Sequence, residues 1–152
     1  MVDLARLAHE WFGPEGCFVA GFDCAILAGK PLKEVGERSP PQHVHAMMHL
    51  PTGKDLLVTS LRLIPPEGRL DFWNLAAWRS TTANRQLRRT QLKEALEREP
   101  AYENVPEVLG GDFNAPANDL VFKLLTQFAD AYREAGCGWG NTGLNNLPNR
   151  AP

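Results

Sequence analysis

Alternation between apolar and polar positions divides the chain into helices and strands. Apolar residues at helical spacing predict a first helix over 4–11, with Asp3 as its N-cap and a stop at 13–16. The same spacing predicts a long helix over 80–98, capped by Ser80, Thr81 or Thr82, and another over 118–134 with Asp119 in its first turn. Short apolar runs predict strands over 17–28, 42–50, 55–63 and 105–112, and the first could be one strand or two, broken near Gly21.

The order of these elements predicts the fold class. It is typical of an α/β protein, a layered α/β sandwich in which a mixed, mostly antiparallel sheet carries the two later helices on one face. A hairpin-type turn over 51–54 further predicts that the strands on either side of it are antiparallel neighbours.

Composition narrows the class of protein. The 152 residues are enough for about one domain, and 43% of them are hydrophobic, which is typical of a globular protein with its own core. A net charge of −2 excludes attraction of nucleic acid by the whole molecule, so any such contact needs a local basic patch. Three cysteines without a CxxC pair indicate reduced thiols and a cytoplasmic location. No apolar run approaches the ~20 residues that span a bilayer, so we expect no membrane partner.

Three groups of side chains leave alternatives open. His43 and His45 share one face of a predicted strand and could bind a transition metal, but no nearby ligand completes the set, so we expect a solvent-facing surface. The aromatic stretch around Trp73 and Trp78 could stack on bases or cap the core, and we expect core packing. The polar face of the 80–98 helix could meet phosphates, but we expect it to be solvated; its basic residues are Arg85, Arg88, Arg89 and Lys93.

The strand over 105–112 ends in an unusual group of residues. Gly110 and Gly111 allow a sharp turn, and Asp112, Phe113 and Asn114 follow at once. If the backbone stays extended, Asp112 and Asn114 lie on one face and Phe113 points to the other. A carboxylate beside a carboxamide could accept a proton from water and hold a phosphate oxygen. The alternative is a strand that ends in a turn, since Gly, Asp and Asn are common turn formers.

This stretch resembles a family motif. Gly111-Asp112-Phe113-Asn114 resembles the GDxN signature of the endonuclease/exonuclease/phosphatase superfamily, which are metal-dependent phosphoesterases with a DNase I-like fold. Arg88 and Gln91 precede the motif in an Arg-x-x-Gln helix, as in that family. The resemblance implies that Asp112 orients the attacking water and binds the metal, Mg²⁺ or Mn²⁺, and that Asn114 binds the phosphate.

Two further residues take their roles from the same resemblance. Arg62 stands before Leu63 where the family commonly has a histidine of the phosphate pocket, so it is either a phosphate-binding fork or an exposed strand-end charge. Asn141, in Gly140-Asn141-Thr142, matches a family segment at the mouth of the site, and is expected to contact phosphate.

The chain also departs from the family pattern. The resemblance covers about 20–150, without the family's Gln-Glu pair before Cys17 or its Ser-Asp-His ending after Arg150. We therefore expect a single partial domain over 1–152, with one sheet edge open to self-association. The implied function is that of a metal-dependent phosphoesterase. Its partner would be a phosphate-containing substrate, for which nucleic acid is one option. We expect this chain alone to have weak activity or none. The alternatives are a non-catalytic phosphate-binding module and an inert fragment.

Overall fold

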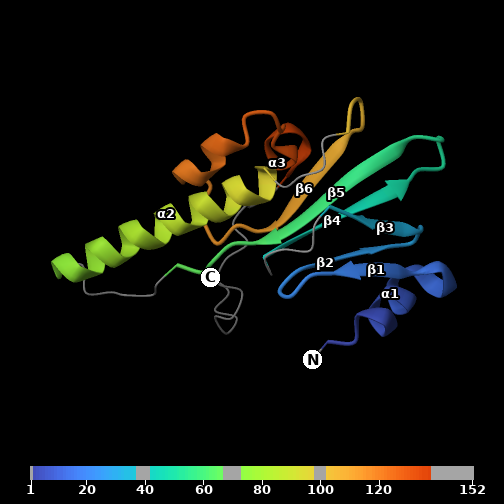
Figure 1. The fold of residues 1–152 in the computed structure, drawn as a ribbon, viewed down its shortest axis with the longest axis horizontal. Helices are drawn as coiled ribbons and strands as arrows, with labels where there is room; N and C mark the ends of the chain where they lie inside the picture. The colour runs from blue at the N-terminus through green and yellow to red at the C-terminus, as the bar shows by residue number, and fades with distance from the viewer. Residues whose placement is uncertain (1, 37–41, 67–72, 98–101, 138–152) are drawn as a thin grey trace.

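A computed structural model describes residues 2–36, 42–66, 73–97 and 102–137 (Figure 1). The elements follow in the order α1 (Leu4–Phe12), η1 (Gly13–Glu15), β1 (Cys17–Ala20), β2 (Ala25–Ala28), β3 (Leu32–Val35), β4 (His43–His49), β5 (Asp55–Arg62), α2 (Leu75–Glu97), β6 (Glu107–Asp112), η2 (Leu120–Leu124) and α3 (Ala131–Ala135), where η marks a 3₁₀ helix. No helix within these ranges is both long enough and apolar enough to cross a membrane.

The strands form two sheets, and the α/β class with a mostly antiparallel mixed sheet is confirmed. In the four-stranded sheet, β3, β4 and β5 are antiparallel neighbours and β6 lies parallel to β5. The expectation that 17–28 joins this sheet is wrong, because β1 and β2 pair only with each other, as the break near Gly21 allowed. The hairpin instead packs across the larger sheet through one apolar cluster: Val19, Ile26, Val44 and Ala46.

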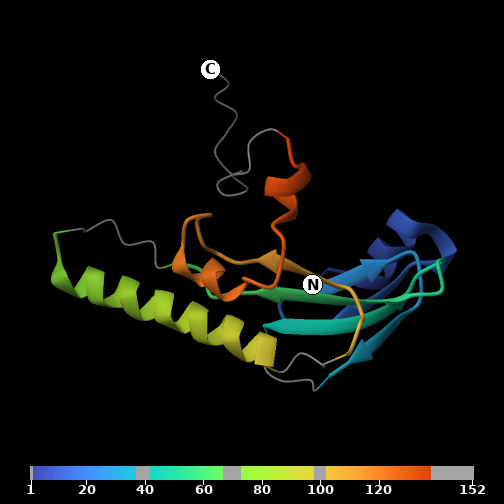
Figure 2. The same ribbon diagram turned by 90° about the horizontal axis from the view of Figure 1, so that it is seen from above.

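A second apolar cluster lies on the opposite face of the four-stranded sheet. It joins the end of β5 to α2 and η2, and its buried members are Leu61, Leu63, Leu92 and Val121. The four-stranded sheet therefore lies between the β1–β2 hairpin on one side and α2 with η2 on the other (Figures 1 and 2). The strand β3 was not predicted, since its short sequence carries charged Lys33 and Glu34.

The long helix differs from its prediction in its start and in its buried face. It begins at Leu75 rather than at 80, because the side chain of Asn74 accepts a hydrogen bond from the Ala76 amide at 2.9 Å and caps the first turn. Asn84 and Arg88 lie on its buried face together with Leu92 and Ala95. The prediction that Arg88 is solvated is therefore wrong, whereas Arg85, Arg89 and Lys93 are exposed.

The predicted helix over 118–134 is replaced by two short elements. Asp119 caps η2 by accepting from the Val121 amide, and Asp130 caps α3 by accepting from the Tyr132 and Arg133 amides. Asp side chains favour such caps over helix interiors, so Asp130 begins a new helix where the apolar stripe predicted a continuous one. Leu124 and Leu125 still pack against the second apolar cluster.

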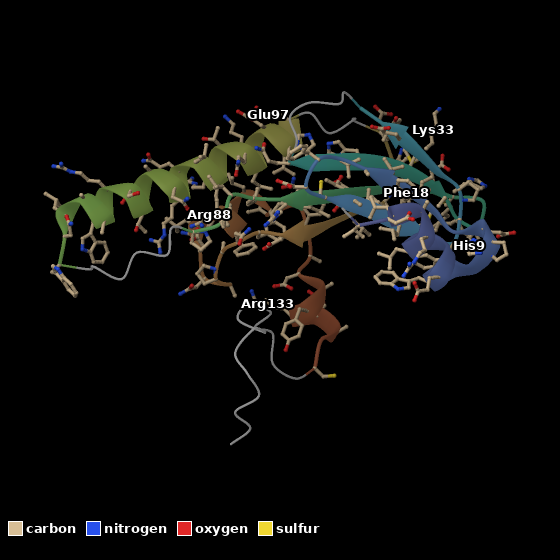
Figure 3. The ribbon with its side chains drawn as sticks, turned by 90° about the horizontal axis from the view of Figure 1, so that it is seen from below. His9, Phe18, Lys33, Arg88, Glu97 and Arg133 are labelled. Atoms are coloured by element: carbon tan, nitrogen blue, oxygen red, sulfur yellow. The ribbon has the colours of Figure 1, made fainter. Side chains whose placement is uncertain are left out.

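A buried ion pair fixes the 3₁₀ helix η2 to α2. The guanidinium of Arg88 lies 3.9 Å from the carboxylate of Asp119, and both side chains are almost fully buried, at 4% and 5% exposed. Figure 3 shows Arg88 on the side of α2 that faces the segment after β6. The exposed Arg85 guanidinium also lies 3.7 Å from the same carboxylate. Loss of the buried Arg88 would leave Asp119 paired with this exposed arginine alone, in a medium of low polarity.

We predict that Arg88→Met destabilises the fold by about 2 kcal/mol or more, because the buried Asp119 carboxylate then keeps only the exposed guanidinium of Arg85 as a partner. Urea denaturation measures the loss. The control is Lys93→Met, which removes an exposed ion pair to Glu97 and should cost below ~0.5 kcal/mol. Equal losses for the two variants would contradict the prediction.

We also predict a sharp contrast between two neighbouring glycines. A Cβ at Gly111 would lie 1.9 Å from the Leu61 carbonyl oxygen, and its φ of +137° disfavours any side chain. A Cβ at Gly110 would meet nothing within 4 Å. Gly111→Ala should therefore cost more than ~2 kcal/mol, and Gly110→Ala should be close to neutral. Matched denaturation curves for the two variants test this, and overlapping midpoints would refute it.

Candidate phosphate-binding site

The site lies where β5 and β6 end side by side. The parallel register places Arg62 opposite Asp112, the last residues of their strands. The Arg62 Nε atom is 3.9 Å from an Asp112 carboxylate oxygen, and both side chains are about half exposed. Because the carboxyl ends of parallel strands meet at one edge, this is where ligands of open α/β sheets tend to bind. The predicted Arg62 and Asp112 are thus brought together.

A second carboxylate, from the β1–β2 turn, joins the pair. Asp23 Oδ1 lies 3.7 Å from the Arg62 guanidinium, on the face of the sheet that the hairpin covers. The sequence pattern assigned Asp23 no role in the site. No local signal could have revealed it, because it depends on how the hairpin packs over β5.

The backbone holds Arg62 in position on both sides. The Arg62 amide donates to the Gln42 carbonyl at 2.8 Å, and the Leu63 amide donates to the Asp112 carbonyl at 2.8 Å. At 3.7 and 3.9 Å, however, the two carboxylate contacts are ion pairs and not hydrogen bonds. The guanidinium therefore keeps N–H donors for an anion that approaches from solvent.

Asn114 reaches the same strand end by a turn rather than by an extended backbone. Its φ is +48°, its amide N–H donates to Asp112 Oδ1 at 3.0 Å, and its Nδ2 donates to the Leu63 carbonyl at 2.7 Å. The backbone therefore turns at Asn114, as the alternative of a strand ending in a turn allowed, and Phe113 points to the other face, where it packs in the second apolar cluster. Asn114 locks the loop, and its Oδ1 and second N–H remain for other contacts.

The neighbouring Cys24 is not poised as a nucleophile. Burial raises the pKa of its thiol to about 11, the charge of Asp23 adds to this, and a hydrogen bond with Ser60 offsets only part. Reactive cysteines need the opposite shift, since the thiolate is the nucleophile.

The described residues do not fit the magnesium or manganese centre that the family resemblance implies. Across the described ranges, no group of three or more His, Cys, Asp or Glu side chains is arranged to hold a metal ion. The two carboxylates that do converge, Asp23 and Asp112, already contact a cation, the Arg62 guanidinium. Mg²⁺ requires several oxygen ligands at close to octahedral geometry.

The histidine pair lies inside the sheet, away from solvent. His43 and His45 are 8% and 3% exposed, so the expected solvent-facing surface is wrong, although they do share a face, with ring centroids 4.9 Å apart. His45 Nδ1 and the Thr59 hydroxyl form a hydrogen bond at 2.8 Å. Burial, and then the proximity of His43, lower the pKa of His45 to about 4.

The two tryptophans of the aromatic stretch are exposed to solvent. Trp73 and Trp78 are 88% and 57% exposed, so the expected core packing is wrong for both. They stand at the start of α2, which extends beyond the sheet (Figure 2). Asn141 lies outside the described residues, as does Phe72.

Comparisons with known proteins give a partial structural likeness. No family model matches the chain, and no curated protein matches it. Among solved structures, a β-hairpin deletion mutant of beta toxin from Staphylococcus aureus is 18% identical with a TM-score of 0.49, covering 68% of this chain and 38% of that one. The beta toxin F277A, P278A mutant with bound magnesium ions is 18% identical with a TM-score of 0.48. The chain thus spans well under half of these proteins, and scores at this level assign it no function.

We predict that His45 makes the fold sensitive to acid. Its folded pKa of about 4 lies below the unfolded value of 6.5, so the neutral form is favoured on folding. The stabilisation is present above pH ~6.5 and is lost as the pH falls towards ~4, by roughly 2–4 kcal/mol.

Denaturation midpoints measured across this range provide the test. His45→Gln, which can still form a hydrogen bond with Thr59, should flatten the pH dependence of the midpoint. His49→Gln, at an exposed position, should leave that pH dependence unchanged. An unchanged slope in His45→Gln would show that other groups cause the acid sensitivity.

Proposed function

We propose that the chain is a phosphoesterase-type domain that binds a phosphate ester at the ends of β5 and β6, and that this chain alone hydrolyses it at a rate near background. One observation carries the binding: Arg62, held by its backbone and half exposed, presents N–H donors beside Asp112 and Asn114. A guanidinium fork matches two phosphate oxygens. The GDxN resemblance supports the same assignment.

Charge favours a diester over a monoester. One guanidinium and two carboxylates give the cluster a formal charge of −1. A phosphomonoester near neutral pH carries more negative charge than a diester, and repulsion from Asp23 and Asp112 increases with that charge. The proposed ligand is therefore a phosphodiester monoanion, a class that includes nucleic-acid backbones.

Weak turnover follows from what the site residues already contact. The Asp112 carboxylate accepts a hydrogen bond from the Asn114 amide and forms an ion pair with Arg62. The Asn114 side chain donates a hydrogen bond to the Leu63 carbonyl. A base that must take a proton from water loses effect when it already accepts a hydrogen bond and faces a cation. Within the described residues no group of three or more ligating side chains is present to hold a metal ion that would stabilise the new charge. Each missing charge-stabilising group costs ~10²–10³ in rate.

Hydrolysis of bis(p-nitrophenyl) phosphate with Mg²⁺ or Mn²⁺ tests the catalytic part. We expect the chain and Asp112→Ala to release p-nitrophenol at indistinguishable rates close to the uncatalysed one. Robust turnover that Asp112→Ala abolishes would contradict this and establish an active phosphodiesterase.

Titration with dimethyl phosphate, followed by amide NMR shifts, tests the binding part. Shifts should cluster at residues around 62 and 112 and disappear in Arg62→Gln. Arg89→Gln, at an exposed position on α2, is the matched control and should keep them. Shifts that survive in Arg62→Gln would place the anion elsewhere, and the absence of any saturable shift would favour an inert domain.

A further inference from the structure

We infer that Arg62 is the resident cation of the Asp23–Asp112 carboxylate pair, and that its guanidinium keeps divalent metal out of the site. The inference deepens the proposed function and rests on it only for the location of the site. It concerns which cation sits between the two acids, and this can be measured without any phosphate ester.

The contacts place one cation between two acids. Arg62 NH1 lies 3.7 Å from Asp23 Oδ1, and Arg62 Nε lies 3.9 Å from Asp112 Oδ2. The two acids come from different parts of the fold, the β1–β2 turn and the end of β6, and both lie within 4 Å of the Arg62 guanidinium. A lone turn acid does not usually face a strand-end acid unless a positive charge lies between them, because like charges repel.

The backbone keeps the guanidinium in this place. Hydrogen bonds from the Arg62 and Leu63 amides fix the end of β5 to the start of β4 and the end of β6. The Arg62 side chain lies on the face that the β1–β2 hairpin covers, where it contacts Asp23. An Arg is always charged in proteins, so this cation does not dissociate with pH as a bound metal does. A divalent ion at the same carboxylates would have to displace a covalently attached positive charge.

Removing that charge should therefore create metal affinity. Without the guanidinium, the two half-exposed carboxylates that now flank it lose their shared counter-charge, and oxygen ligands of this kind attract a hard cation. A unit positive charge about 4 Å away repels a divalent ion even in water, so its loss should tighten binding by at least ~10-fold.

The experiment measures Mn²⁺ binding to the full chain by the loss of the free Mn²⁺ EPR signal at fixed ionic strength. Wild type should show no saturable binding up to millimolar Mn²⁺. Arg62→Gln should bind one Mn²⁺ at least ~10-fold more tightly than wild type. Arg62→Lys keeps the charge and should behave as wild type, while Arg62→Gln combined with Asp23→Asn should lose the gain.

Each other outcome overturns the inference. Stoichiometric Mn²⁺ binding by wild type that Asp112→Asn removes would show a metal site that coexists with Arg62. No gain in Arg62→Gln, or a gain that persists without Asp23, would show that the guanidinium is not what excludes the metal. Arg62→Ala serves as a second neutral variant, and circular dichroism confirms that each variant is folded. Failure of dimethyl phosphate to bind would count against the proposed function alone, because no phosphate enters this measurement.

Discussion

The exit of β5, residues 63–65, is the constraint on which the rest of the structure depends. Four hydrogen bonds converge there: the Leu63 amide donates to Asp112, Asn114 donates to the Leu63 carbonyl, the Ile64 amide donates to Gln91, and Asn84 donates to the Pro65 carbonyl. One comes from the last residue of β6, one from the loop after it and two from α2. Residues 63–65 lie outside any helix or strand, and their backbone N–H and C=O groups find hydrogen-bond partners in segments distant in sequence. These bonds set the position of α2 and of the candidate site together.

This arrangement explains why polar residues occupy the buried face of α2. Asn84 and Gln91 face the sheet because the backbone at 64 and 65 needs partners, and Arg88, between them, meets the Asp119 carboxylate. Polar groups in a protein interior are tolerated when they are paired. In this chain the two residues of the Arg-x-x-Gln spacing have structural contacts: Gln91 accepts from the Ile64 amide after β5, and Arg88 pairs with Asp119.

Sequence patterns predicted what depends on local order and failed where distant contacts decide. The strands β4, β5 and β6, the turn between β4 and β5 and the opposite orientation of Phe113 all follow from alternation and turn chemistry. Apolar periodicity misplaced the inner face of α2, because two of its buried residues, Asn84 and Arg88, are polar. It also merged η2 with α3, because Leu125 and Phe128 extend the apolar stripe beyond the end of η2, almost to Asp130, which caps α3. The Asp23 contact could not be predicted, since only the packing of the hairpin creates it.

Asp112 and Asn114 of the motif make structural hydrogen bonds and also border the candidate site, and these bonds limit what the site can do. A catalytic group contributes most when its bonding changes between the bound substrate and the transition state. Here Asp112 accepts a hydrogen bond from the Asn114 amide while it faces Arg62, so it would have to weaken existing contacts to act as a base. Asn114 already uses one side-chain N–H on a backbone carbonyl of the β5 exit and has one left for a substrate. A bound anion, in contrast, needs only the outward donors of Arg62 and disturbs none of these bonds. The same residues therefore make a rigid anion-recognition edge more readily than an efficient hydrolytic centre.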